Sequence, residues 1–137
     1  MTYFTKVFIL MGCLSSLALS HITIENAWAR PGHKGKNTAV YFDIITDEKD
    51  ISLNEAQSNA GGSTEIHTHI HENGIMKMRQ ISALPCTGTT SLKPGGDHIM
   101  LIDLNDSLKE GDTTSLTLTF SNGHHHTMTV PVRKPKV

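Results

Sequence analysis

The feature that most constrains the fold of this chain is a succession of short, strand-like runs with turn residues between them. Each run is about four to eight residues long, and several are bounded by Gly, Pro, Asn or Asp. No window keeps the 3.6-residue period of an amphipathic helix. The predicted strands are residues 22–25, 39–45, 51–57, 64–70, 75–81, 89–92, 99–104, 115–120 and 127–132.

This regular spacing of short strands predicts an all-β fold, a Greek-key antiparallel β-sandwich. The 117 residues that follow Ser20 suffice for a single domain with its own core. There is no internal repeat and no low-complexity linker, so residues 21–137 are expected to form one domain.

Residues 1–20 have the pattern of a secretory signal peptide. Lys6 precedes an apolar run over residues 7–19, and Ala18 and Ser20 are small residues at positions −3 and −1 of a cut before His21. The run is shorter than the about 20 residues that span a membrane, and no later stretch is apolar enough to replace it. A second interpretation treats residues 10–13 as a lipoprotein processing box that leaves a lipidated Cys13. Both place the protein outside the cytoplasm, and the periplasm is the expected compartment.

Charge and cysteine content exclude several classes of protein. After residue 20 the chain carries 11 basic and 13 acidic residues, so nothing suggests binding to nucleic acid. Cys86 is the single cysteine of this part, which rules out an intramolecular disulfide. We expect it to be a spare thiol in a loop.

Asn73 and Gly74 predict a β-hairpin with a two-residue type I′ turn. Such a turn sets His71 opposite Met76 and His69 opposite Met78. Because side chains alternate along strands, five donors then share one face, with isoleucines on the other. The five are His67, His69, His71, Met76 and Met78.

A second group of donors, His98 and Met100, follows the Gly95-Gly96 turn. Thioether sulfur is a soft ligand that suits Cu(I) alongside imidazole, whereas zinc sites prefer Cys, His and carboxylate. The two groups therefore indicate copper. The alternative is a polar solvent face with methionines in ordinary packing.

These residues resemble the periplasmic copper chaperones of the PCuAC family. His67 is followed after ten residues by Met78, and residues 94–100, Pro-Gly-Gly-Asp-His-Ile-Met, match the closing motif of the family. Residues 27–30, 39–42, 108–112 and 116–120 are similar to its framework strands. The resemblance covers nearly the whole chain after residue 20.

The resemblance implies that His67, Met78, His98 and Met100 are the Cu(I) ligands on a cupredoxin-like fold. It also implies a chaperone that delivers copper to the dinuclear site of cytochrome c oxidase subunit II or to a related cuproprotein. A thiol-bearing protein of the Sco type is the expected companion.

The chain departs from the family pattern in three places. The stretch between Met78 and His98 is shorter than usual, His71 stands where many members have a methionine, and the His/Met-rich tail of some members is absent. A secondary metal site, including one for Cu(II), and an exposed polar surface both stay open as roles for the remaining donors. They are His69, His71, Met76, His124, His126 and Met128.

No Ser-His-Asp or paired-carboxylate arrangement has a persuasive spacing, so we expect no enzyme. Two alternatives stay open: a secreted copper-dependent redox enzyme and a β-sandwich binding module without metal. Trp28, Tyr41 and Phe42 are expected to pack in or beside the core, and Glu65 and Glu72 to be solvated.

Overall fold

The computed structural model describes residues 21–135, and the regular structure of this part is β-strand throughout, as predicted. Every named pair of strands is antiparallel. The strands are β1 (Ile22–Ala29), β2 (Thr38–Gln57), β3 (Gly61–Glu72), β4 (Ile75–Ile81), β5 (Leu84–Ser91), β6 (His98–Leu104), β7 (Thr113–Phe120) and β8 (His125–Pro131).

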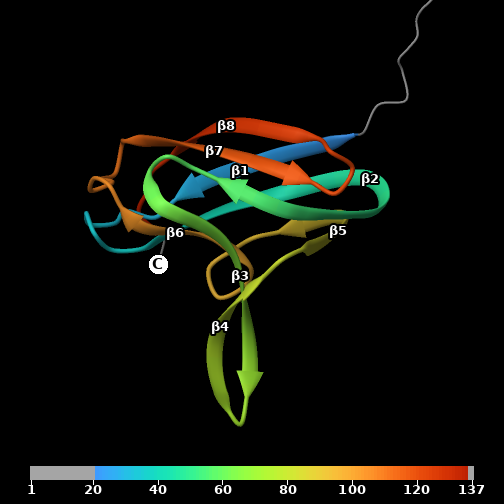
Figure 1. The fold of residues 1–137 in the computed structure, drawn as a ribbon, viewed down its shortest axis with the longest axis horizontal. Helices are drawn as coiled ribbons and strands as arrows, with labels where there is room; N and C mark the ends of the chain where they lie inside the picture. Colours follow the sequence, from blue (N-terminus) through green and yellow to red (C-terminus); the bar gives the residue numbers. More distant parts are fainter. Residues whose placement is uncertain (1–20, 136–137) are drawn as a thin grey trace, which may run out of the picture.

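The long strand β2 is the centre of the sheet (Figure 1). Its first half pairs with β1 and β6, its second half pairs with β7, and β5 pairs along its middle. The register with β5 shifts between Thr46 and Ile51, where Asp50 has a φ of 57°. We predicted separate strands at residues 39–45 and 51–57, which is wrong, because the polar residues between them form an irregularity within one strand instead of a loop.

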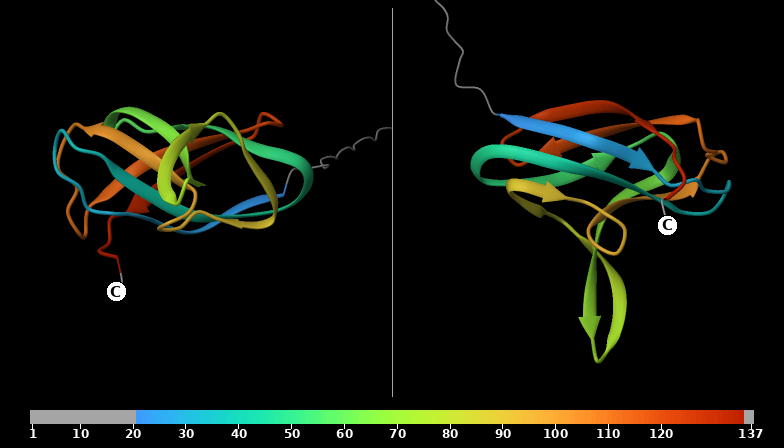
Figure 2. Two further views of the ribbon diagram at one scale, coloured as in Figure 1. Left: turned by 90° about the horizontal axis from the view of Figure 1, so that it is seen from below. Right: turned by 180° about the vertical axis from the view of Figure 1, so that it is seen from behind.

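The strand order β4-β3-β6-β2-β7-β8, with β1 and β5 also paired to β2, makes one eight-stranded sheet. This sheet folds over on itself, so that its two halves face each other as layers (Figures 1 and 2). A bridge between Ala29 and Val132 brings the end of β1 beside the residue that follows β8. The antiparallel sandwich is thus confirmed, and both of its layers belong to one continuous sheet.

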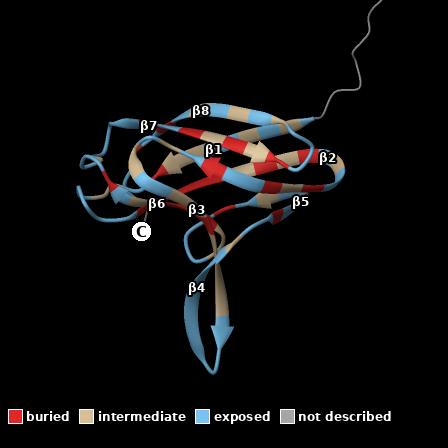
Figure 3. Ribbon diagram, viewed as in Figure 1, coloured by how far each residue is buried: buried red, intermediate tan, exposed pale blue. Residues whose placement is uncertain are grey.

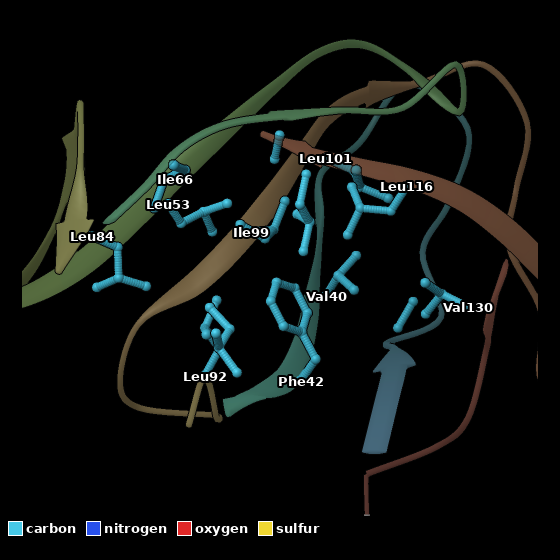
Figure 4. Packing of buried hydrophobic residues seen from close by; sticks show 14 of the residues in the cluster. Val40, Phe42, Leu53, Ile66, Leu84, Leu92, Ile99, Leu101, Leu116 and Val130 are labelled. Carbon is cyan, nitrogen blue, oxygen red and sulfur yellow. The ribbon is translucent and has the colours of Figure 1, made fainter. Parts of the chain in front are cut away.

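Apolar side chains from the inner faces fill the space between the layers (Figure 4). Leu53 has no exposed surface and lies opposite Leu84 of β5 on one side and Phe120 of β7 on the other. Tyr41 and Phe42 are buried as expected. Burial of this cluster supplies the main favourable term for folding.

Cys86 belongs to this core. It lies in β5, its side chain is 2% exposed, and its thiol donates to the Leu84 carbonyl at 3.3 Å. Burial raises the pKa of the Cys86 thiol. The prediction of a spare thiol in a loop is therefore wrong: Leu84 and Cys86 are two residues apart on a strand and both point inward.

The hairpin of β3 and β4 projects from the sandwich as an arm (Figures 1 and 2). The first half of β3 pairs with β6 in the body, whereas β4 pairs with β3 alone among the described strands. Almost all of β4 is exposed (Figure 3). Its donors are therefore held by hairpin geometry more than by packing.

The described part of the chain contains no helix of the length and apolar character that crossing a membrane requires. The predicted signal peptide over residues 1–20 and the alternative lipid site at Cys13 lie outside the described residues.

Leu53→Ala should lower the free energy of unfolding by about 2–5 kcal/mol, because it opens a cavity where three strands meet. Denaturant unfolding followed by circular dichroism would measure this. Ile75→Ala is the matched control; Ile75 is 57% exposed on the arm, so its truncation should change stability by less than about 0.5 kcal/mol. If both changes lowered the free energy of unfolding by the same amount, the burial of Leu53 and the exposure of Ile75 would be contradicted.

Candidate metal centre

The turn of the arm has the predicted form. Asn73 and Gly74 have φ values of 53° and 77°, and two positive φ angles in succession define a type I′ turn. The register that follows pairs His71 with Met76 and His69 with Met78. Since directly opposite residues share a face, the five donors of the arm lie on one side of it, as predicted.

Strand β6 carries the second group of donors to the same face. His67 of β3 is directly opposite His98, and Glu65 is directly opposite Met100. The imidazole rings of His67 and His98 have centroids 5.7 Å apart. Met78 is paired with His69, which is the next residue after His67 on the same face of β3. The structure thus brings all four residues that the resemblance selects to one face of β4, β3 and β6.

These donors differ strongly in exposure. His98 is 3% exposed and Met100 is 9% exposed, whereas Met78 is 52% exposed. His67 is half-buried between them. An ion held by this set would have a buried side on β6 and an open side on β4.

The carbonyl of Gly96 holds two histidines at once. His98 Nδ1 and His69 Nδ1 lie 3.0 and 2.9 Å from this oxygen. A carbonyl only accepts, so each Nδ1 carries the proton, and in the neutral ring the free lone pair is on Nε2. Backbone contacts of this kind fix the tautomer of metal-binding histidines.

His67 is held the other way round. Its Nε2 donates to Glu65 Oε1 at 2.8 Å, so in the neutral ring the lone pair is on Nδ1. That Nδ1 is the one buried side-chain nitrogen or oxygen among the described residues without a hydrogen-bond partner. Buried polar atoms are normally paired, so this nitrogen is a candidate ligand atom.

Sequence reasoning missed the role of Glu65, which we expected to be solvated. It is half-buried and orients His67. The signal was present, because residues two apart on a strand share a face.

Sequence reasoning also missed the role of the turn between β5 and β6. Thr68 donates to Asp97 Oδ1 at 2.6 Å, and Gly96 N donates to the Lys93 carbonyl at 2.9 Å. These bonds hold the Gly96 carbonyl beside both histidines.

Aromatic rings close the buried side of the site. Tyr41 of β2 lies 6.3 Å from His98 between ring centroids, and Trp28 of β1 lies 4.9 Å from Tyr41. Tyr41 is 5% exposed and the partly buried Trp28 packs against it, so both residues pack beside the core as expected. The Tyr41 ring thus lies beside the His98 ring, and the Trp28 ring lies beside Tyr41.

Burial is the main cause that lowers the pKa of His98. The Gly96 carbonyl opposes this shift, and the nearby His67 and His69 add to it. His98 therefore stays neutral, and able to bind a metal, at a lower pH than an exposed histidine.

Within residues 21–135, no three His, Cys, Asp or Glu side chains form a group that could hold a metal ion by themselves. A closed site of the usual zinc type is therefore not found there. Any site on this face needs methionine sulfur to complete its ligands, which favours copper over harder ions.

The other donor group, on β8, has a different environment. Met128 packs against the core opposite Leu116, and His126 lies opposite Leu118. His124 precedes the strand, and its ring lies 6.1 Å from that of Phe120. Burial, followed by the neighbouring His124, lowers the pKa of His126. Met128 thus has a packing role, and metal binding by His124, His126 and Met128 stays a prediction.

Comparison with known proteins decides the family. Residues 22–132 match the family model described as "Putative lipoprotein LpqE-like". The chain belongs to the LpqE-like family. It is 32% identical to "Putative lipoprotein Lxx21020" of Leifsonia xyli over 82% of this chain and 69% of that protein. It is 34% identical to "Uncharacterized protein RP573" of Rickettsia prowazekii over 77% of this chain and 62% of that protein, so it spans about two thirds of the length of these relatives.

Solved structures of PCuAC domains have the fold of this chain, in agreement with the resemblance seen in the sequence. The copper-bound PCuAC domain from PmoF2 superposes with a TM-score of 0.66 at 23% identity, covering 89% of this chain and all of that domain. The Cu(I) form of DR1885 from Deinococcus radiodurans has a TM-score of 0.60 at 28% identity, covering 86% of this chain and 80% of that one. The cupredoxin-like fold is thereby confirmed.

The lowered pKa of His98 has a testable effect on stability. As pH falls below about 6.5, the unfolded chain takes up a proton that folded His98 does not, so the free energy of unfolding should decrease until the pH reaches the folded pKa. NMR titration of the imidazole signals in the metal-free protein would identify His98 as a ring that titrates below pH 6.5. Denaturant unfolding should show a smaller loss of stability on acidification in His98→Asn. A His98 ring that titrates at or above 6.5 would contradict its burial.

Proposed function

We propose that this protein is a copper carrier that holds one Cu(I) ion with His67, Met78, His98 and Met100. The observation that carries the proposal is the pair of facing imidazoles, His67 and His98, flanked by two thioethers on the same face. The buried Nδ1 of His67, which has no hydrogen-bond partner, supports it. Copper is the cargo of the protein in this proposal, as the copper-bound relatives suggest.

The donor set fits Cu(I) in both chemistry and protonation. Thioethers have no proton to lose, and the free Nε2 of His98 and Nδ1 of His67 follow from the hydrogen bonds of the opposite ring nitrogens. Thioethers also resist the disulfide chemistry that removes thiolates in an oxidising compartment. The sulfur of Met100 lies on the buried side and that of Met78 on the open side.

The uneven exposure suits transfer of the ion more than turnover of a substrate. An acceptor can place its own ligands on the open side and displace Met78 first, while Met100 and the histidines still hold copper. Catalysis by a metal normally uses an open coordination position, which a four-ligand set leaves out. We therefore favour a chaperone over a copper-dependent redox enzyme or a module without metal.

The cellular part of the proposal follows from the PCuAC resemblance. The chain is exported to the periplasm by its N-terminal signal peptide, or held there through Cys13. It passes copper to the dinuclear site of cytochrome c oxidase subunit II or to a related cuproprotein, with a Sco-type thiol protein as companion. A carrier with an exposed ligand on a projecting arm has the geometry that such a hand-over requires.

Anaerobic titration with Cu(I) against a chromogenic chelator tests the site. We expect one tight equivalent, with an affinity that falls by about tenfold or more in Met78→Leu, Met100→Leu and His98→Asn. Met128→Leu is the matched control, because Met128 packs against the core and should leave the affinity unchanged. Unchanged affinity in all three site variants would overturn the assignment.

Transfer itself can be measured with the copper-free soluble domain of an oxidase subunit II. Incubation with the Cu(I)-loaded protein, separation and metal analysis should show copper on the acceptor. Retention of all copper by the donor would contradict delivery to this acceptor while leaving the binding site intact.

A further inference from the structure

The arm carries further histidine and methionine side chains between the proposed site and the tip of the hairpin. Going from the sandwich to the tip, the register of β3 and β4 pairs His69 with Met78 and then His71 with Met76. Each pair sets an imidazole directly across from a thioether, with Cβ atoms about 5 Å apart. Successive pairs are two residues along each strand, or about 7 Å. The donors therefore form a ladder that leads from the tip to His67.

The histidines of this ladder become more exposed toward the tip, whereas Met78 and Met76 have similar exposures of 52% and 50%. His98 and Met100 at its base are 3% and 9% exposed, and Met76 at its outer end is 50% exposed. His69 is half-buried and His71 is exposed. The tip of the arm is exposed (Figure 3), so both side chains of the outer pair are open to solvent and partner molecules.

The opposite face of the arm has a different chemistry. Ile75, Lys77 and Arg79 alternate with the donors along β4 and so lie on the other side. Lys77 pairs there with Glu72, with 3.3 Å between Nζ and Oε1. The donor face thus carries no cation from β4 that would repel Cu(I).

The middle pair is connected to the proposed site. His69 donates through Nδ1 to the Gly96 carbonyl, which also accepts from His98, and the rings of His69 and His98 have centroids 5.4 Å apart. Its Nε2 lone pair is free, and its cross-strand partner is Met78, a ligand of the proposed site. A cuprous ion bound by this pair would share the ligand Met78 with the inner site.

We infer that His71 and Met76 form an entry site for Cu(I), from which the ion moves through His69 to the four-ligand site. This inference rests on the proposed function. The ion stays Cu(I) throughout, so no electron is transferred. At each step a lone pair of the next pair binds before one of the previous pair leaves, and neutral imidazole and thioether donors exchange no proton.

Uptake kinetics test the entry site in the full chain. Cu(I) would be delivered anaerobically from a chromogenic chelator, and its loss followed by stopped-flow absorbance. Met76→Leu and His71→Asn should slow uptake several-fold while the affinity for the first equivalent stays within about threefold of wild type. NMR of the methionine methyl groups should show that a second, weaker equivalent shifts Met76. Unchanged uptake in both variants, or no response of Met76, would overturn the inference.

The register provides a matched control. The double variant Ile75→Met/Met76→Leu keeps the number of methionines at the tip but moves the thioether to the opposite face of β4. It should take up Cu(I) as slowly as Met76→Leu. Recovery of the wild-type rate would show that a nearby sulfur suffices and would contradict the ladder.

Failure of this inference differs from failure of the proposed function. A tight first equivalent with normal uptake in the tip variants removes the entry site alone. Loss of the tight equivalent in wild type removes the four-ligand site, whatever the tip variants show.

Discussion

The arrangement of donors depends on the register of β3, which pairs with β4 along one edge and with β6 along the other. The side-chain period of a strand is two, so a slip of one residue at either edge would turn every donor of the moved strand to the opposite face. The Asn73-Gly74 turn sets the first register. The second is set where Ile66 of β3 meets Ile99 of β6 in the core.

The sandwich and the arm have different roles in the proposed copper carrier. In the sandwich, packing and the clamp at Gly96 hold His98 and His69 in one tautomer. On the arm, the methionine side chains are exposed and are positioned by the pairing of β4 with β3. The buried half favours retention of an ion, because its ligands are already oriented. The exposed half favours release, because an approaching partner can reach it.

Several features of the fold could be predicted from the sequence because they are local. Alternation and turn residues located the strands, and β4 was predicted with its observed bounds. The pairing of His69 with Met78 needed only the loop length of one hairpin. The errors arose where tertiary contacts decide. β2 continues through polar residues because β1, β5 and β7 supply partners on both sides of the irregularity, and Cys86 is buried because β5 packs on β2.

By itself the sequence determined an all-β domain, a donor face on one hairpin and the chemistry of that face, since these follow from side-chain period, turn type and ligand softness. Only the tertiary structure decided that His67 faces His98 and that the Gly96 carbonyl, which accepts from His98, also reaches His69. Those contacts join residues of β3 to β6 and its preceding turn, about 30 positions away in the chain. No local pattern specifies such pairs, because the packing of the whole sheet brings them together.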